Sequence, residues 1–283
     1  MVIHVFIAHM GIGGAERVCV NLANEWAAKG HEVHIVTLNL DGDINTQNLT
    51  GSVQVHTLGV SRLRYSFLPM YRYLRRFKPR FMFVFGNEMA VIIQKLRSLH
   101  LVKTPIIVRV LNNVNISLAK EDGISPVVEE YLRRAQKNLR QMEHVVAQCE
   151  AMGNQLTDKG EVDSEHLSVI YNPVSKNLCE KVRSLRKTRP DDSNSKKEIV
   201  FIGRIDPQKN PLDLLTAFDK LCIKRGMEGA SDTGLRFVGD GVLKEIVSNK
   251  SQELGISDKV IFDGIRQDME NVYAGADVVA LSS

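Results

Sequence analysis

The sequence predicts an α/β protein in which parallel strands alternate with helices. Short, almost continuously apolar runs recur along the chain, and segments with helical periodicity separate several of them. Runs of this kind are typical of strands that helices cover on both faces, as in a doubly wound sheet. The chain has 283 residues, 43% of them hydrophobic, which is enough for two domains of about 150 residues each.

The first half of the chain contains seven apolar runs that predict strands, at residues 2–8, 33–38, 53–57, 81–85, 106–110, 144–148 and 167–170. After the first run, Val18, Leu22 and Trp26 recur with helical spacing, and we expect Gly30 to end that helix as its C-cap. The repeated order of strand and helix favours parallel pairing. We therefore predict a Rossmann-like domain over residues 1–173.

The second half begins with a change in composition. Polar and basic residues dominate 175–197, and we interpret this segment as a linker or as an irregular segment on the surface. After it, strands are predicted at 198–203, 235–238, 259–263 and 277–281, and helices at 209–225, 241–254 and 268–274. A second doubly wound domain is thus predicted over residues 174–283. Because the chain ends directly after its fourth strand, we expect this domain to be incomplete.

Composition excludes several classes of protein. A charged fraction of 25% and eight prolines do not fit a collagenous or low-complexity chain. The four cysteines form no C-x-x-C pair, which favours a reduced, cytoplasmic protein. The apolar N-terminus lacks the basic region and cleavage site of a signal peptide, and no apolar run reaches the roughly 18 residues of a membrane span. If the chain meets a membrane, we expect it to do so at the surface.

The first candidate site is the loop Gly11-Ile-Gly13-Gly14-Ala-Glu16, between a strand and a helix. Its glycines let backbone N–H groups approach an anion, and the helix N-terminus adds partial positive charge, so phosphate binding is one interpretation. A tight turn that needs glycine is the other. Dinucleotide binding is less favoured, because the G-x-G-x-x-G pattern would need glycine in place of Glu16. A nicotinamide-dependent oxidoreductase remains a minor hypothesis on this loop alone.

The second candidate site opens the second domain. Arg204 and Lys209 follow the strand at 198–203, and ligands of doubly wound sheets bind at the carboxyl ends of strands. The two cations are placed to converge on one diphosphate through charge-assisted hydrogen bonds, although a solvated basic turn would have the same sequence. Gly239-Asp240-Gly241 also follows a strand. This segment either approaches a nucleotide or lets Asp240 N-cap a helix, and capping is favoured.

No metal site and no cofactor are predicted. Asp41-Gly42-Asp43 matches the D-x-D pattern of metal-dependent sugar transfer, but no third ligand is indicated and turn chemistry is favoured. The histidines show no H-E-x-x-H spacing. Neither a G-x-S-x-G nor a Walker A sequence occurs, which argues against α/β-hydrolase and P-loop chemistry.

A basic segment spans residues 62–80 and contains no acidic residue. An apolar helical stripe is expected from Phe67, Met70, Tyr71, Leu74 and Phe77. Beside it stand the basic residues Arg62, Arg64, Arg72, Arg75, Arg76, Lys78 and Arg80. Two interpretations stay open: contact with an anionic membrane surface or acceptor, or a helix docked on its own sheet with a solvated basic face. Nucleic acid is disfavoured because no recognised nucleic-acid-binding fold fits.

Several segments, in this order, carry a family resemblance: Gly13-Gly14-Ala-Glu16-Arg-Val18, Gly30-His-Glu-Val33, Tyr171-Asn172-Pro173, Gly203-Arg204 with Gln208-Lys209-Asn210, Gly239-Asp240-Gly241, and Asp258 to Gly264 leading to Tyr273-Ala-Gly-Ala-Asp-Val278. With these motifs the chain resembles the retaining GT-B glycosyltransferases of family 4, the "glycosyl transferases group 1" type. The resemblance covers the whole chain. It implies a GT-B fold of two Rossmann-like domains, the second incomplete, with the acceptor mostly on residues 1–173 and the nucleotide-sugar on residues 174–283.

The resemblance also implies a function. The chain would be a hexosyltransferase-type enzyme that moves a sugar from a nucleotide-diphosphate donor, a UDP-sugar, to a glycan or lipid-linked acceptor in surface polysaccharide biosynthesis. Arg204 and Lys209 would neutralise the diphosphate, as a metal does elsewhere, and Gly13 and Gly14 would face the same phosphates across a cleft.

Other residues receive weaker roles from the same resemblance, and no catalytic base is assigned. Those expected near the nucleotide are Gly239, Asp240 and Arg266, and those expected near the acceptor or sugar are Arg109, Asn112 and Asn113. The family's E-x(7)-E segment, whose second glutamate holds the ribose, does not occur before Ser283. A catalytically inactive fragment or a nucleotide-sugar-binding module is therefore the alternative.

Overall fold

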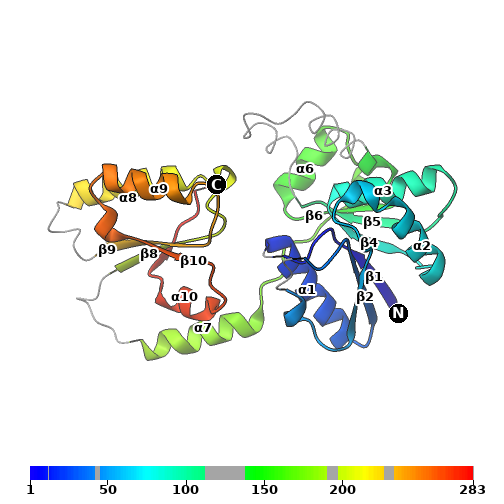
Figure 1. The fold of residues 1–283 in the computed structure, drawn as a ribbon, viewed down its shortest axis with the longest axis horizontal. Helices are drawn as coiled ribbons and strands as arrows, with labels where there is room; N and C mark the ends of the chain where they lie inside the picture. The colour runs from blue at the N-terminus through cyan, green and yellow to red at the C-terminus, as the bar shows by residue number, and fades with distance from the viewer. Residues whose placement is uncertain (12, 42–44, 112–137, 190–196, 226–232, 283) are drawn as a thin grey trace. The chain divides into compact units, whose positions relative to one another are not determined.

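The computed structural model describes residues 1–11, 13–41, 45–111, 138–189, 197–225 and 233–282. Within it the chain forms two compact units, Met1–Pro173 and Val174–Ser283 (Figure 1). Each unit is a parallel sheet with helices on both faces, and each is described by itself.

Unit 1 contains a parallel sheet in the order β3-β2-β1-β4-β5-β6-β7. Its strands are β1 (Val2–Phe6), β2 (Glu32–Thr37), β3 (Val53–Thr57), β4 (Met82–Phe85), β5 (Ile106–Arg109), β6 (His144–Ala147) and β7 (Leu167–Val169). All seven predicted strands are confirmed. The strand order reverses direction at β1, since β2 and β3 extend the sheet on one side and β4 to β7 on the other. The carboxyl end of β1 is therefore the switch point of this sheet, where doubly wound folds bind ligands.

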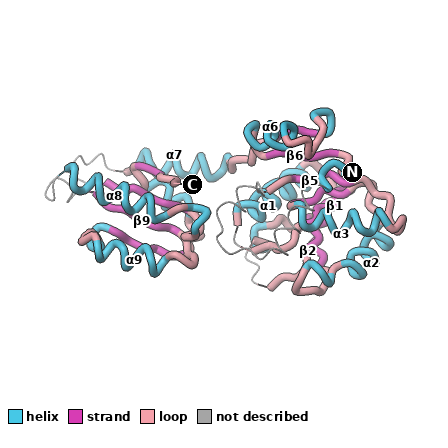
Figure 2. Tube along the Cα trace, turned by 90° about the horizontal axis from the view of Figure 1, so that it is seen from above, coloured by secondary structure: helices cyan, strands magenta, loops and turns pink. Residues whose placement is uncertain are grey.

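Helices cover both faces of the unit 1 sheet, as Figure 2 shows. Helix α1 (Gly14–Ala28) buries Val18, Cys19 and Ala23 against one face. Helices α2 (Phe67–Phe77) and α3 (Asn87–Ser98) contribute to the core on the other face, and α6 (Glu150–Asp158) adds Leu156 there. Burial on both faces explains why the strands are almost continuously apolar. Gly30, with φ 81°, follows α1 in the left-handed conformation expected of its C-terminal glycine.

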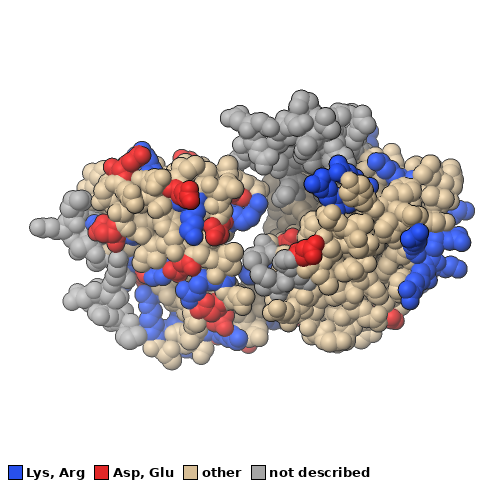
Figure 3. All heavy atoms as spheres, in the orientation of Figure 1, with Lys and Arg blue, Asp and Glu red and all other residues tan. Residues whose placement is uncertain are grey.

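Helix α2 carries the basic segment and is docked on its own sheet. Met70, Tyr73 and Leu74 are buried, whereas Arg72, Arg75 and Arg76 are exposed. Figure 3 shows Lys and Arg side chains gathered over this end of unit 1. Of the two interpretations of this segment, docking of the helix on its own sheet is observed, and its basic residues are exposed. Among the described helices, none combines the length and apolar character needed to cross a bilayer.

Unit 2 contains a parallel sheet in the order β10-β9-β8-β11. Its strands are β8 (Lys197–Ile202), β9 (Thr233–Val238), β10 (Val260–Gly264) and β11 (Val278–Val279). Helices α8 (Pro211–Arg225) and α9 (Lys244–Glu253) pack on one face of the sheet, and α10 (Met269–Gly275) packs on the other. The alternation predicted for residues 198–281 is confirmed, although the last strand is shorter than expected.

One prediction for this unit is wrong. The supposed linker at 175–197 begins with a helix, α7 (Lys176–Thr188), which lies along α10. Ser175 caps it, since its Oγ accepts a hydrogen bond from the Leu178 N–H at 3.3 Å. Leu178 reaches the core beneath α10, and the Arg186 guanidinium donates to the carbonyl oxygens of Tyr273 and Ala276. Leu178, Val182 and Leu185 recur with helical spacing in α7. No residue of the helix is buried, however, and polar and basic residues dominate the segment, which is why its composition indicates a linker.

Candidate functional site

The carboxyl ends of β8, β9 and β10 form one continuous backbone surface. The Gly203 N–H donates to the Val238 carbonyl at 3.0 Å, and the Gly239 N–H donates to the Gly264 carbonyl at 2.8 Å. One residue further along, the Ile205 N–H donates to the Asp240 carbonyl at 2.9 Å. The three loops are thus hydrogen-bonded to each other directly after their strands, which places the Arg204 segment beside the Gly239-Asp240-Gly241 segment.

Two glycines permit this close approach of the loops. A Cβ on Gly239 would lie 1.9 Å from the Gly203 carbonyl oxygen, and a Cβ on Gly241 would lie 2.4 Å from the Ile205 carbonyl oxygen. Gly239 also has φ 141°, which a residue with a side chain rarely adopts. The Gly-Asp-Gly pattern therefore has glycines because two loop backbones pack against each other at this edge of the sheet.

Asp240 is not the N-cap of the following helix, contrary to the favoured prediction. Helix α9 begins at Lys244 with Leu243 as its N-cap, and no side chain caps it. The Asp240 carboxylate instead accepts a hydrogen bond from the Gly241 N–H at 2.8 Å and lies 3.7 Å from Lys244 Nζ. The turn between strand and helix is longer than the sequence pattern indicated, because Gly241 first packs on the β8 loop.

Arg204 and Lys209 occupy the turn after β8. The Arg204 side chain is 65% exposed, and its Nη1 lies 3.1 Å from Asp206 Oδ2. Its Nη2 donates to Gln208 Oε1 at 2.6 Å. Lys209 ends the short helix η5 (Pro207–Lys209), and its Nζ forms no ion pair with another described residue. Both cations therefore have donors available to an anion at the carboxyl end of the strand.

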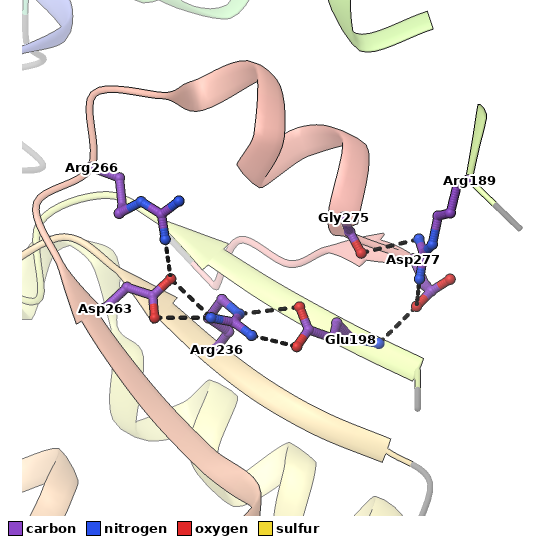
Figure 4. A network of polar contacts seen from close by, with 7 residues as sticks. All are labelled: Arg189, Glu198, Arg236, Asp263, Arg266, Gly275 and Asp277. Carbon is purple, nitrogen blue, oxygen red and sulfur yellow. Dashed lines mark hydrogen bonds and ion pairs between the residues drawn. The ribbon is translucent and has the colours of Figure 1, made fainter. Parts of the chain in front are cut away.

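Arg266 lies in a different environment, and Figure 4 shows its contact with Asp263. Its Nε and Nη2 donate to the two oxygens of Asp268 at 2.7 and 2.6 Å, and its Nη1 donates to Asp263 at 3.2 Å. These hydrogen bonds from Arg266 lower the pKa of Asp268 well below its usual range. Since the guanidinium is held by two carboxylates, the structure favours a structural role for Arg266.

Asp263 links this group to a second arginine on the sheet. Arg236 lies between Glu198 and Asp263, with its Nη1 2.9 Å from Asp263 Oδ1 and its Nε donating to Glu198 Oε2 at 3.1 Å (Figure 4). The hydrogen bonds to Glu198 chiefly raise the pKa of the Arg236 guanidinium. This network joins β8, β9 and β10. It explains why strands that are predicted from mainly apolar runs also carry charged side chains.

In unit 1, Gly13 and Gly14 lie at the switch point after β1. Gly13 is the N-cap of α1, and no side chain caps the helix. The Glu16 carboxylate folds back over this N-terminus, so a Cβ on Gly13 would lie 2.0 Å from its Oε2. Asn45 supports the loop by donating to the Gly11 carbonyl. The loop therefore lies at the predicted position after β1. The structure shows no requirement for glycine there, because Gly13 is extended with φ −156°, its Cβ would meet only the flexible Glu16 side chain, and a Cβ on Gly14 would meet nothing within 4 Å.

Arg109 is buried at the end of β5, with 2% of its surface exposed. Its Nη2 donates to the Ile170 carbonyl at 3.1 Å and to Asn172 Oδ1 at 2.8 Å, and burial lowers its pKa. Asn172 in turn donates to Gln148 Oε1 at 2.9 Å. This chain of contacts holds the Tyr171-Asn172-Pro173 segment and favours a structural role for Arg109 over contact with a sugar. Asn112 and Asn113 lie outside the described residues.

Two residues at these edges were not singled out from the sequence. Asn87 begins α3 directly after β4, next to the switch point, and its buried Oδ1 has no hydrogen-bond partner among the described residues. Ser282 follows β11, and its Oγ lies 2.9 Å from the carbonyl oxygens of both Lys209 and Asn210. Lone Asn and Ser residues carry no pattern, so only the tertiary structure reveals their positions.

The described residues contain no group of three or more His, Cys, Asp or Glu side chains that could hold a metal ion. Asp41 is described, whereas the rest of the Asp41-Gly42-Asp43 pattern lies outside the described residues. No contact of this pattern with an ion or a ligand is therefore assigned.

Two doubly wound units, each built on its own parallel sheet, form the architecture of GT-B glycosyltransferases. The sequence profile of Glycosyltransferase Family 4 matches residues 12–178, and that of Glycosyl transferases group 1 matches residues 185–283. The chain belongs to glycosyltransferase family 4.

Known proteins agree with this assignment. The D-inositol 3-phosphate glycosyltransferase of Mycolicibacterium smegmatis is 29% identical over 60% of this chain and 38% of its own length. A Campylobacter jejuni enzyme is 28% identical over 100% of this chain and 73% of its own: the GalNAc-alpha-(1->4)-GalNAc-alpha-(1->3)-diNAcBac-PP-undecaprenol alpha-1,4-N-acetyl-D-galactosaminyltransferase. Anabaena HepE, solved with UDP and glucose, has the same fold, with a TM-score of 0.72 at 17% identity over 99% of this chain and 74% of that one.

Proposed function

We propose that this protein is a retaining, hexosyltransferase-type glycosyltransferase that uses a UDP-sugar and a glycan or lipid-linked acceptor in surface polysaccharide biosynthesis. The observation that carries the proposal is the pair of cations after β8. Arg204 is exposed and held in place by two neighbours, and Lys209 has no ion pair with another described residue. The pair stands at the carboxyl end of the first strand of unit 2, where doubly wound sheets bind ligands.

Such a pair suits the chemistry of sugar transfer. When the bond between the anomeric carbon and the donor diphosphate breaks, negative charge develops on the leaving oxygen of UDP. An arginine fork and a lysine ammonium on the diphosphate would stabilise that charge more strongly in the transition state than in the intact donor. Gly13 and Gly14, at the switch point of unit 1, are proposed to supply backbone donors for a phosphate group.

The other residues predicted to lie near the nucleotide or the acceptor receive weaker proposed roles. Gly239 and Asp240 belong to the backbone surface beside Arg204, which supports a place near the nucleotide. For Arg266 and Arg109, the intramolecular hydrogen bonds support positioning of loops at the strand ends instead.

The choice of donor and acceptor follows the relatives. The Campylobacter enzyme is named for transfer of N-acetylgalactosamine to an undecaprenol-linked glycan, and HepE was solved with UDP and glucose. A lipid-linked glycan acceptor and a uridine donor are therefore the first substrates to test.

The test is a turnover assay with the 283-residue chain. The donors are UDP-glucose, UDP-galactose and their N-acetylamino counterparts, each with and without an undecaprenyl-diphosphate-linked glycan. We expect one donor to give acceptor-dependent release of UDP and a product that keeps the α configuration by NMR. An inverted product would contradict the retaining mechanism. UDP binding without turnover of any donor would instead support the alternative, a nucleotide-sugar-binding module.

We also propose that the basic face of α2 contacts anionic lipid, which would bring the chain to lipid-linked acceptors at the cytoplasmic leaflet. Arg72, Arg75 and Arg76 are exposed on one helix without an acidic neighbour in the segment, and Leu68 is 51% exposed beside them. Each basic residue near an anionic surface contributes about 1 kcal/mol.

Vesicle flotation tests this contact. Changing Arg72, Arg75 and Arg76 to Glu is expected to abolish binding to vesicles that contain about one-third phosphatidylglycerol, because attraction becomes repulsion. Reversal of Lys220 and Lys224 on the exposed side of α8 is the control and should leave binding unchanged. Equal flotation of the triple variant and the wild type would contradict the proposal.

A further inference from the structure

We propose that Asp206 is a positioning residue for the donor diphosphate, because its carboxylate fixes both Arg204 and Lys209. The inference rests on the function proposed above, which assigns these two cations to the diphosphate. Asp206 is an acidic residue between two cations, and its side chain is only 15% exposed. It therefore points into the turn and not toward solvent.

One carboxylate oxygen orients the arginine. Asp206 Oδ2 lies 3.1 Å from Arg204 Nη1, while Gln208 Oε1 accepts from Nη2 at 2.6 Å. An exposed arginine normally samples many rotamers, and fixing it in one geometry before the ligand arrives reduces the entropy lost on binding. Each Nη group has a second N–H, so two donors at the far corners of the guanidinium remain for phosphate.

The other carboxylate oxygen shapes the turn that carries the lysine. Asp206 is the N-cap of η5, and its Oδ1 accepts from the Lys209 N–H at 3.1 Å. The next residue, Asn210, has φ 49°, a left-handed conformation that Asn tolerates better than most residues. On the opposite side of the turn, the Ser282 hydroxyl donates to the Lys209 and Asn210 carbonyls. The backbone of Lys209 is thus held from both sides.

If charge alone mattered, the Asp206 carboxylate would weaken the binding of UDP. A carboxylate beside a diphosphate site repels the ligand, so its removal would strengthen binding if Coulomb interaction dominated. If the two contacts dominate, its removal weakens binding because Arg204 and Lys209 lose their orientation. The sign of the change in UDP affinity therefore decides between the two.

The experiment measures UDP affinity by calorimetry for the wild type, Asp206→Asn, Asp206→Ala and Arg204→Ala, and for Asp206→Asn in the Arg204→Ala background. Asn keeps an oxygen for the Lys209 N–H but not the charged contact with Arg204. We expect UDP binding to weaken about threefold in Asp206→Asn and about tenfold in Asp206→Ala. In the Arg204→Ala background, Asp206→Asn should cause no further loss, a non-additivity that a purely structural role would not produce.

Each outcome has one meaning. Unchanged or tighter UDP binding in Asp206→Asn, or equal losses with and without Arg204, would overturn the positioning role. Should Asp206→Ala fail to fold, Asp206→Asn decides alone. Asp258→Asn, which removes one exposed carboxylate from unit 2, is the matched control and should bind UDP as the wild type does. If the wild type itself does not bind UDP, the donor assignment fails first, which distinguishes that failure from a failure of the Asp206 proposal.

Discussion

Replacing Arg204 and Lys209 together by alanine is expected to weaken UDP binding about a hundredfold. A hydrogen bond to a charged group contributes about 1.5–3 kcal/mol, and we take the lower end for each cation because Arg204 is largely exposed before the ligand binds. Two such losses amount to about 3 kcal/mol, which corresponds to a factor of about 100 in Kd. Calorimetric titration with UDP checks this value.

The control must remove the same charge from the same unit. Lys220→Ala with Lys224→Ala changes two exposed lysines on α8, and neither forms an ion pair with another described residue. This double variant should keep UDP affinity within about twofold of the wild type, since screening by salt weakens distant surface charges. If the Arg204 and Lys209 double variant also stayed within that range, the donor site would have to lie elsewhere on the chain.

Unit 1 is expected to lose stability as the pH falls from 7 to 5, because it buries a row of histidines under α2. The rings of His4, His34 and His56 stack across β1, β2 and β3, with centroids 4.6 and 5.1 Å apart. His4 is 2% exposed and accepts or donates a hydrogen bond at 2.8 Å with the Tyr73 hydroxyl. The other charged or titratable groups that face the row are Glu32, 2.9 Å from His34, and Arg76, whose charge acts on His56.

Burial, followed by the like charges of His34 and His56, lowers the pKa of His4 from 6.5 to about 4. The pKa of His56 is lowered as well, first by burial. Between pH 6.5 and pH 4 the unfolded chain therefore binds more protons than the folded chain, so stability is fully present above pH 6.5 and is lost on acidification. For His4 alone the loss between pH 7 and pH 5 is about 2 kcal/mol.

Denaturant unfolding at pH 7 and pH 5 measures this loss. Trp26, the single tryptophan, packs edge-on against Phe83 in unit 1, so its fluorescence reports that unit alone. His4→Gln should be less stable than the wild type at pH 7 but lose about 2 kcal/mol less on acidification. His166→Gln changes an exposed histidine and should keep the wild-type pH dependence. Identical pH dependence in His4→Gln and the wild type would show that His4 is not the group that titrates.

The strands of both units could be predicted because they are buried on two faces. A buried parallel strand must be apolar almost throughout, and glycine must follow it where loops approach each other, as at Gly239 and Gly241. The linker prediction failed at α7 because it rested on polar and basic composition, although Leu178, Val182 and Leu185 recur there with helical spacing. The sequence pattern also failed to show where α9 begins, since Gly241 first packs on the β8 loop.

By itself, the sequence determined the α/β class and the alternation of strands and helices, because each leaves a periodic pattern. It also determined the glycine loop of unit 1, the two cations after β8 and the resemblance to family 4, because these are local motifs. Only the tertiary structure decided which polar residues face inward. Arg109 is buried and Arg266 is held by two carboxylates, whereas the Arg204 side chain is 65% exposed, and in the sequence all three are simply arginines at or just after strand ends. The contacts of Asp206 and Ser282 with the Lys209 turn likewise join residues whose spacing obeys no rule. Their roles depend on which atoms the fold brings within about 3 Å of one another, the range in which hydrogen bonds form.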